Sequence, residues 1–195
     1  MIIYGATLSP FVRKAVAFAT EKGVEFQLKF AGGGVGDDDF KACSPFGKIP
    51  ALRDGDFTIS DSTAIITYLD ALKRDPVLIP ADPKERARTI WYEEFGDTIL
   101  AACGGKMFFN RIVAPRFLKR EGDLAAADKA EGEELPPILD YVESVIPESG
   151  YLVGDRFSLA DIAVASPFAN LLHLNIDLNA AKRPKTAGLD RKSVV

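Results

Sequence analysis

The sequence has little of what disulfide frameworks, metal sites and membrane spans require. Its 195 residues include two cysteines and one histidine. Cys43 and Cys103 lie far apart without CxxC spacing, which argues against a disulfide framework or a zinc site, and His173 alone gives a metal site almost no material. No apolar run approaches the ~18 residues of a membrane helix, and the start lacks a basic leader region. We expect a cytoplasmic protein without a metal or a membrane partner.

Net charge and composition indicate an ordinary globular protein and argue against one class of partner. The formal net charge of −4 argues against nucleic acid as the main partner. The basic cluster Lys182, Arg183 and Lys185 is interpreted as part of a solvated tail. Hydrophobic residues make up 47% and charged residues 27%, as in ordinary soluble globular proteins. The length allows one large or two small domains with a proper core.

Residues 1–75 alternate between strand and helix patterns. A short apolar strand at residues 2–4 precedes a helix that Ser9 can cap and Gly23 can end. Residues 25–30 alternate strictly, as in a half-buried strand, and Asp54-Gly55 predicts a hairpin between the next two strands. A helix then opens at Ser60 or Asp61. The predicted order is β-α-β-(loop or short α)-β-β-α, an α/β thioredoxin-like N-terminal domain.

The remainder of the chain shows only helical patterns. Residues 76–83 are proline-rich and are predicted to be a linker. Residues 84–119 and 123–146 are helical in composition, with Pro136-Pro137 kinking or restarting the second segment. A further helix begins at Ser158, where Asp161 completes a pattern that resembles a capping box. Residues 84–195 are therefore predicted to be an all-α helical C-terminal domain.

The segment before the predicted hairpin indicates a peptide-binding backbone. Pro50 enters a strand, and X–Pro is the linkage that adopts cis at modest cost. A cis Ile49–Pro50 bond would turn the Ile49 backbone outward, leaving its N–H and C=O free. A small peptide could pair with them as an added strand.

Ser9 has a structural and a chemical interpretation. As a cap ahead of Pro10, it would stabilise its helix by ~1 kcal/mol. A hydroxyl beside the positive end of a helix can also donate to a thiolate, and a free thiol with a pKa near 8.5 is only ~3% ionised at pH 7. Residues 9–12 contain no cysteine, so the thiol would come from the ligand. Tyr4 is the alternative activating hydroxyl, although it is predicted to lie inside the first strand.

Asp61 and Ser62 begin the third predicted helix. They either cap it or form an anion site, in which backbone N–H groups and the Ser62 hydroxyl hold a carboxylate while Asp61 accepts from an ammonium group. Lys48 could meet a second carboxylate, although it could equally be an ordinary surface lysine. Together with Ser9 and Ile49, these residues define a pocket for a small acidic thiol peptide.

These motifs resemble those of the cytosolic glutathione transferases of the serine type. The matching segments are Ser9-Pro10-Phe11 with Arg13, Phe46-Gly47-Lys48-Ile49-Pro50, Asp61-Ser62-Thr63-Ala64-Ile65, and the structural signature at residues 154–161. The resemblance implies that Ser9 hydrogen-bonds the sulfur of glutathione. It implies that the Ile49 backbone, next to cis-Pro50, pairs with the cysteinyl residue. It also implies that Asp61 and Ser62 hold the γ-glutamyl end and Lys48 the glycyl carboxylate.

The resemblance also implies partners and a reaction. Phe46 matches an aromatic that inserts into the partner subunit in several classes, which predicts a homodimer, although Phe46 could also be local core. Glutathione is expected as co-substrate, with no other cofactor, and its thiolate would attack a hydrophobic electrophile. That electrophile's pocket is assigned to residues that could equally be core: Phe11, Met107, Phe108, Phe109 and Arg111. The alternatives are a non-catalytic binding module, or an isomerase, dehalogenase or etherase reaction.

Two segments fit the family pattern less well. The glycine-rich run 32–36 lacks the Gly-Lys-Ser/Thr ending of a phosphate loop and is followed by three aspartates, so we predict a mobile loop there. After Asn175 the resemblance weakens, and the tryptophan usual in the family's next helix is missing, since Trp91 is the one tryptophan of the chain.

Overall fold

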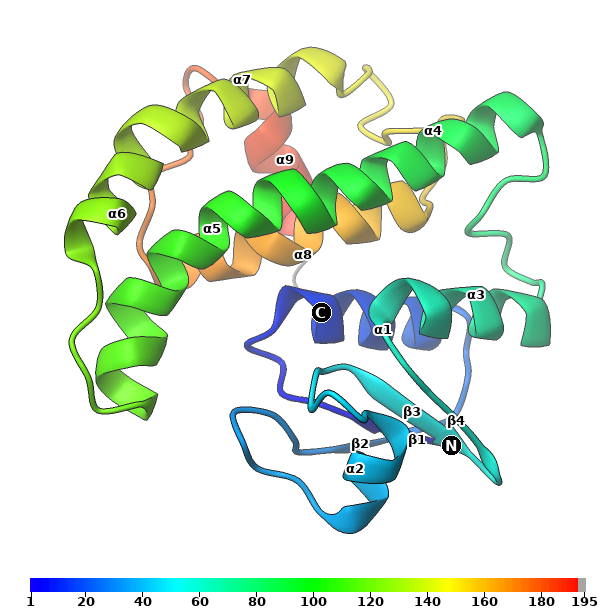
Figure 1. The fold of residues 1–195 in the computed structure, drawn as a ribbon. Coiled ribbons are helices and arrows are strands. Elements are labelled where there is room, and N and C mark those ends of the chain that lie inside the picture. Colours follow the sequence, from blue (N-terminus) through cyan, green and yellow to red (C-terminus); the bar gives the residue numbers. More distant parts are fainter. Residues whose placement is uncertain (193–195) are drawn as a thin grey trace. The chain divides into compact units, whose positions relative to one another are not determined.

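A computed structural model describes residues 1–192 of the chain, and its side chains up to residue 188 (Figure 1). The chain divides into two compact units, Met1–Ile79 and Pro80–Val195. The division falls inside the proline-rich segment that was predicted to be a linker. The first unit is α/β and the second is helical, which confirms the predicted fold class.

The α/β unit contains a four-stranded sheet with the strand order β2-β1-β3-β4. Strand β1 is parallel to β2 and antiparallel to β3, and β3 and β4 form the predicted hairpin. Helices α1 and α3 lie together on one side of the sheet, and α2 lies on the other (Figure 1). The elements are β1 (Ile2–Tyr4), α1 (Pro10–Glu21), β2 (Gln27–Lys29), α2 (Asp38–Cys43), β3 (Ala51–Asp54), β4 (Phe57–Ser60) and α3 (Ser62–Leu72).

Strand β2 is shorter than predicted, and the glycine-rich run that follows it forms a turn. The strand covers only Gln27–Lys29, because it is the outer strand of the sheet and Phe30 beyond it is 66% exposed. The run is a hydrogen-bonded turn, in which Gly32 and Val35 exchange backbone bonds of 2.8 and 3.0 Å. Asp37 then caps α2 by accepting from the Phe40 N–H at 2.8 Å. The glycine-rich run is therefore a turn that leads into a capped helix.

Lys22 fastens the end of α1 to the end of α3. Its side chain is fully buried, and its ammonium group pairs with Asp70 at 2.7 Å. It also donates to the carbonyl oxygens of Arg74 at 3.0 Å and Pro76 at 2.8 Å. The methylene stem lies in the core while the charge is fully satisfied, which is what a buried lysine requires.

We expect Lys22→Met to lower the free energy of unfolding by about 2–4 kcal/mol, because two carbonyls lose their donor and Asp70 loses its counter-charge. Urea denaturation measures this loss. Lys73→Met is the matched control, since the exposed Lys73 ammonium group donates to a single carbonyl among the described residues, that of Gly23. Equal losses in the two variants would contradict the role assigned to Lys22.

The second unit consists of helical segments around one apolar core. Phe168 and Leu171 from α8, Met107 from α5 and Leu139 from α7 are among the buried residues of this core. The segments are α4 (Pro83–Glu94), η1 (Phe95–Leu100), α5 (Ala101–Phe108), η2 (Phe109–Phe117), α6 (Leu124–Lys129), η3 (Ala130–Glu134), α7 (Leu135–Val145), α8 (Leu159–His173) and α9 (Pro184–Lys192).

The three segments labelled η are wider π-type turns inside longer helical runs, and they were not predicted. The segment η3 ends where the proline pair 136–137 enters the first turn of α7. Prolines lack the N–H that a continuing α-helix needs, but they fit a first turn. The predicted interruption at this pair is therefore a restart.

The capping box at the start of α8 is confirmed. The Asp161 carboxylate accepts from the Ser158 N–H at 2.9 Å and from its hydroxyl at 3.1 Å. It also accepts from the Leu152 N–H at 2.9 Å. Burial raises the pKa of Asp161. Both residues serve the fold of the helical unit, as expected.

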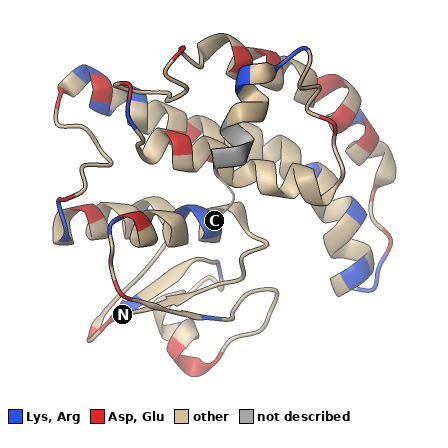
Figure 2. Cartoon of the chain, turned by 180° about the vertical axis from the view of Figure 1, so that it is seen from behind, with Lys and Arg blue, Asp and Glu red and all other residues tan. Residues whose placement is uncertain are grey.

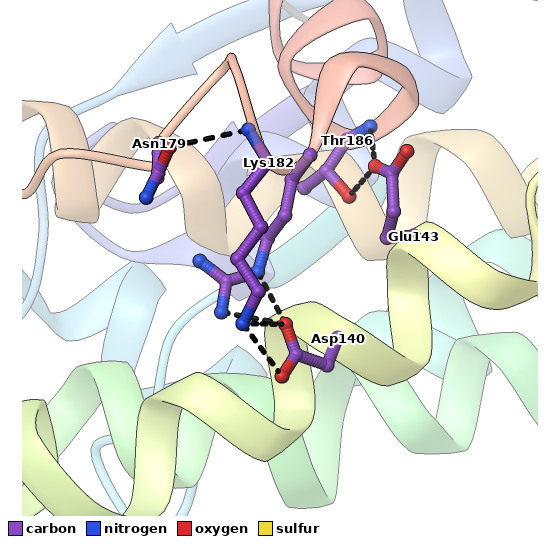
Figure 3. Close-up of polar contacts among 6 residues, drawn as sticks. Asp140, Glu143, Asn179, Lys182 and Thr186 are labelled. Carbon is purple, nitrogen blue, oxygen red and sulfur yellow. Dashed lines mark hydrogen bonds and ion pairs between the residues drawn. The ribbon is translucent and has the colours of Figure 1, made fainter.

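The basic cluster near the C-terminus is not a solvated tail, and this prediction was wrong. Arg183 is 7% exposed and pairs with Asp140 of α7 at 2.6 Å. Glu143, one turn further along α7, accepts from the N–H and the hydroxyl of Thr186, both at 2.8 Å (Figure 3). Glu143 thus holds the first turn of α9, and Asp140 holds the residue just before it. The hydrogen bonds of Arg183 and Lys182 lower the pKa of Asp140.

Candidate active site

Three segments of the α/β unit meet at one end of its sheet. Tyr4, the last residue of β1, pairs with Ala51, the first residue of β3. Ala51 in turn pairs with Ser60, the last residue of β4. The segments that follow β1, precede β3 and follow β4 therefore leave the sheet at the same end. They carry the residues predicted to bind the peptide ligand: Ser9, Lys48, Ile49, Pro50, Asp61 and Ser62.

Ser9 occupies the N-cap position of α1, but its side chain makes no capping hydrogen bond. Its backbone is fixed, since the N–H donates to the Ala6 carbonyl at 2.9 Å and the C=O accepts from Arg13 at 3.0 Å. The residue is partly exposed. The hydroxyl is thus held at the positive end of a twelve-residue helix and is not used by the helix itself.

Arg13 stabilises the loop that carries Ser9. Its guanidinium donates to the carbonyl oxygen of Thr7, two residues before Ser9. Burial lowers the pKa of Arg13 to about 10, so the group stays charged at neutral pH. The sequence showed Arg13 only as part of a motif, because a bond to a loop carbonyl leaves no pattern in the sequence.

The Ile49–Pro50 peptide bond is cis. Among residues 1–192, no hydrogen bond to the N–H or C=O of Ile49 is found. The adjacent Lys48 carbonyl accepts from the Ser44 hydroxyl at 2.7 Å, which fixes the turn before it. A Cβ atom on Gly32 would lie 2.8 Å from the Ile49 side chain, so the glycine-rich turn packs closely on Ile49. The sequence did not indicate that contact.

Asp61 both caps α3 and keeps part of its carboxylate available. Its Oδ1 accepts from the N–H groups of Thr63 at 2.9 Å and Ala64 at 3.1 Å. Its backbone has φ of 90°, a conformation that L-residues rarely adopt, and its N–H donates to the Pro50 carbonyl at 3.2 Å. Ser62 follows as the first helical residue and is 3% exposed. Capping therefore uses one carboxylate oxygen, and the segment is tied to the cis-proline.

Lys48 is exposed, and within the described part of the chain its ammonium group has no ion pair. It is thus available to an anionic ligand group. Among the same residues, no three His, Cys, Asp or Glu side chains lie together as a metal site.

Tyr4 lies at the same end of the sheet, but its side chain is enclosed. It is 1% exposed, and its ring packs against Phe40 of α2 at 5.9 Å. It belongs to a buried cluster with Cys43, and its hydroxyl has no hydrogen-bond partner among the described residues. Because the hydroxyl is enclosed under α2, Tyr4 is poorly placed to activate a thiol at the start of α1.

The residues predicted to line a co-substrate pocket differ in exposure and in their contacts. Phe11 is partly exposed on α1. Met107 is fully buried in the core of the helical unit, and Phe108 is 5% exposed. Arg111 is held by Asp128 and Glu131 of the neighbouring segments, at 2.7 and 2.5 Å. Met107 and Arg111 therefore have structural roles in the helical unit.

Both cysteines are free and buried. Burial raises the pKa of the Cys103 thiol to about 11 and raises that of Cys43. Protonated, enclosed thiols are poor nucleophiles.

Comparisons with known proteins identify the family of the chain. Residues 3–77 match the family described as "Glutathione S-transferase, N-terminal domain", and residues 103–189 match "Glutathione S-transferase, C-terminal domain". A glutathione S-transferase of Hyoscyamus muticus is 30% identical over 189 residues, which cover 94% of this chain and 88% of that protein. The chain belongs to the glutathione S-transferase family. Glutathione S-transferase 3 of Zea mays, a further member, is 32% identical over 164 residues, or 82% of this chain and 72% of that protein.

Solved structures of this family share the fold. Glutathione transferase F7 from Populus trichocarpa superposes with a TM-score of 0.82 at 25% identity, covering 98% of this chain and 92% of that one. Glutathione S-transferase III in its apo form gives 0.80 at 30% identity, covering 100% and 91%. The recognition of the family and its thioredoxin-like fold is thereby confirmed. In the described part of the chain, no helix is long and apolar enough to cross a membrane.

Proposed function

We propose that this family member is a serine-type glutathione transferase that conjugates glutathione to an apolar electrophile. The observation that carries the proposal is the Ser9 hydroxyl, which stands at the start of α1 without a capping bond. It lies at the same end of the sheet as the Ile49 backbone and the start of α3. The glutathione sulfur would accept the hydroxyl's hydrogen bond.

The remaining contacts follow from the chemistry of glutathione. The Ile49 N–H and C=O pair with the backbone of its cysteinyl residue, and α3 with Ser62 receives the γ-glutamyl carboxylate. The free oxygen of Asp61 accepts from the γ-glutamyl ammonium group, and Lys48 meets the glycyl carboxylate. The thiolate sulfur then forms a bond to the electrophilic carbon, and that carbon's leaving group departs with its electron pair, or an activated double bond takes up the electrons and then a proton.

Two measurements separate binding from catalysis. Isothermal calorimetry with glutathione tests the binding site, and a panel of aryl halides, epoxides and enones tests conjugation. We expect binding together with thioether formation from at least one electrophile. Binding without any turnover would favour a glutathione-binding module, and absence of binding would contradict the proposed site.

We also propose that the chain forms a homodimer through Phe46. This side chain is 88% exposed on the turn between Ser44 and Gly47. The helical unit has an aromatic pocket of about 350 Å³ in which Trp91 is 49% exposed. Such a pocket could receive one aromatic ring from a second copy. Its lining includes Arg88, Trp91, Tyr92, Tyr141, Val145 and Leu152.

Phe46→Ser is expected to shift the protein from dimer to monomer in sedimentation velocity, because the buried ring is lost from the interface. Trp91, as the one tryptophan, should emit at longer wavelength in the variant, since it stays exposed to water. Phe30→Ser is the control, because Phe30 is a comparably exposed ring of the same unit. An unchanged mass and emission for Phe46→Ser would contradict the proposed insertion.

A further inference from the structure

The end of η2 and the loop after it present cationic and apolar side chains together. We call residues 116–120 the basic tip. Its cations are Arg116, Lys119 and Arg120, all exposed. Between them, Phe117 is 59% exposed and Leu118 is 42% exposed. Figure 2 shows Lys and Arg residues gathered at this end of the helical unit, in a chain whose net charge is −4.

The cations of the basic tip are not paired with neighbouring carboxylates. Within the described residues, none of the three forms an ion pair, whereas Arg111 earlier in η2 is bridged by two acids. The Arg120 guanidinium lies over the Phe109 ring, 5.4 Å from its centroid. Asp123 nearby uses its carboxylate to cap α6, accepting from the Ala126 N–H at 2.9 Å, which leaves Glu121 as the adjacent exposed acid.

Two backbone hydrogen bonds tie the basic tip to the end of η2. The Leu118 N–H donates to the Val113 carbonyl and the Arg120 N–H to the Ala114 carbonyl, both at 3.1 Å. Lys119 between them has φ of 53°, which turns the chain out of the helix. The exposed apolar pair is therefore displayed on a closed helix end and is not part of a frayed one.

Two hydrogen bonds of the Asn110 side chain anchor the loop that follows the basic tip. The Asn110 side chain donates to the Lys106 carbonyl and accepts from the Asp123 N–H, each at 2.9 Å. Because the loop is tied back onto η2, presenting the basic tip to a partner costs little further ordering.

We propose that the basic tip binds the surface of anionic lipid membranes. Aromatic and aliphatic side chains flanked by Lys and Arg are the pattern that enters the boundary between headgroups and acyl chains. Each basic residue close to an anionic leaflet strengthens binding about fivefold, so three of them supply roughly a hundredfold. A site for a polyanion alone would need the cations but not the exposed Phe117 and Leu118. This surface binding requires no spanning helix and leaves the proposed glutathione site unaltered. It departs from the expectation, based on the sequence, that the protein has no membrane partner.

Co-sedimentation of the full chain with lipid vesicles tests the proposal. Vesicles of phosphatidylcholine alone are compared with vesicles in which part of it is replaced by phosphatidylglycerol. We expect binding only to the anionic vesicles, weakened by added salt. Arg116→Gln/Lys119→Gln/Arg120→Gln should lose roughly a hundredfold in partition. Phe117→Ser/Leu118→Ser should lose at least tenfold, with conjugation activity and thermal stability of both variants unchanged.

A matched triple variant distinguishes the basic tip from net charge. Lys84→Gln/Arg86→Gln/Lys129→Gln removes the same charge from exposed positions elsewhere in the helical unit. Its partition should change by less than about threefold. No binding of the wild type to anionic vesicles, or equal losses in the two triple variants, would overturn the proposal. Binding to soluble polyglutamate that persists in Phe117→Ser/Leu118→Ser would also overturn it, in favour of an acidic protein partner.

Discussion

Ser9→Ala is expected to lower the conjugation rate at neutral pH about twentyfold. If the wild-type site lowers the pKa of the glutathione thiol from ~8.5 by about two units, most of the thiol is ionised at pH 7, against ~3% without that help. Loss of the hydroxyl raises this pKa, so the ionised fraction falls at neutral pH. The deficit should shrink as pH rises, and it should nearly vanish about one unit above the free thiol's pKa. Initial rates measured across pH with saturating glutathione check this.

Three variants serve as controls for the Ser9 result. Thr7→Val removes a hydroxyl from the same loop, and Tyr4→Phe removes the alternative activator, which is enclosed under α2. Both should keep the wild-type pH profile. Ser9→Thr keeps a hydroxyl at the cap position and should retain a substantial part of the rate. A deficit of Ser9→Ala that is the same at every pH would mean a structural defect and would argue against thiol activation.

Asp61→Asn should raise the KM for glutathione by roughly 10- to 100-fold with little loss of stability. The amide oxygen still caps α3, but the charge that would meet the γ-glutamyl ammonium is gone, and a hydrogen bond to a charged group contributes ~1.5–3 kcal/mol. Asp61→Ala should show the same KM effect and also lose about 1 kcal/mol of unfolding free energy, because the cap is lost. Kinetics and urea denaturation on the two variants measure the two effects separately.

Asp82 offers a matched control for the cap. Its Oδ1 accepts from the N–H groups of Lys84 and Glu85, both at 3.0 Å, as Asp61 does from the residues of α3. Asp82→Ala should therefore lose similar stability and leave the KM for glutathione unchanged. If Asp61→Asn binds glutathione as tightly as the wild type, Asp61 is only a helix cap.

The α/β unit could be predicted closely because its signals are local. Pro10 after a serine, Asp54-Gly55 between two strand patterns and Asp61 before an apolar helix each act within a few residues. Those short-range patterns place the strands and helices, and the register of the sheet then brings their ends together. The candidate site is assembled from such ends, which is why most of its residues could be named from the sequence.

What the sequence did not reveal depends on contacts between distant residues. The pairing of Asp140 with Arg183 joins residues 43 positions apart, so the basic cluster looked like a solvated tail. In the same way, Arg111 is held by acids 17 and 20 positions later in the chain. The sequence of an apolar or charged helix face does not identify the element that packs against it. For this reason the residues of the co-substrate pocket could not be assigned reliably from the sequence.

The most direct test of the account is the ionisation of glutathione on the protein. Ultraviolet difference absorbance of the thiolate, recorded for bound glutathione as a function of pH, gives the pKa of its sulfur in the wild type and in Ser9→Ala. We predict a pKa about two units below ~8.5 in the wild type and a value close to that of the free thiol in the variant. The same pKa in both proteins would contradict the assignment of Ser9 as the thiol-activating residue.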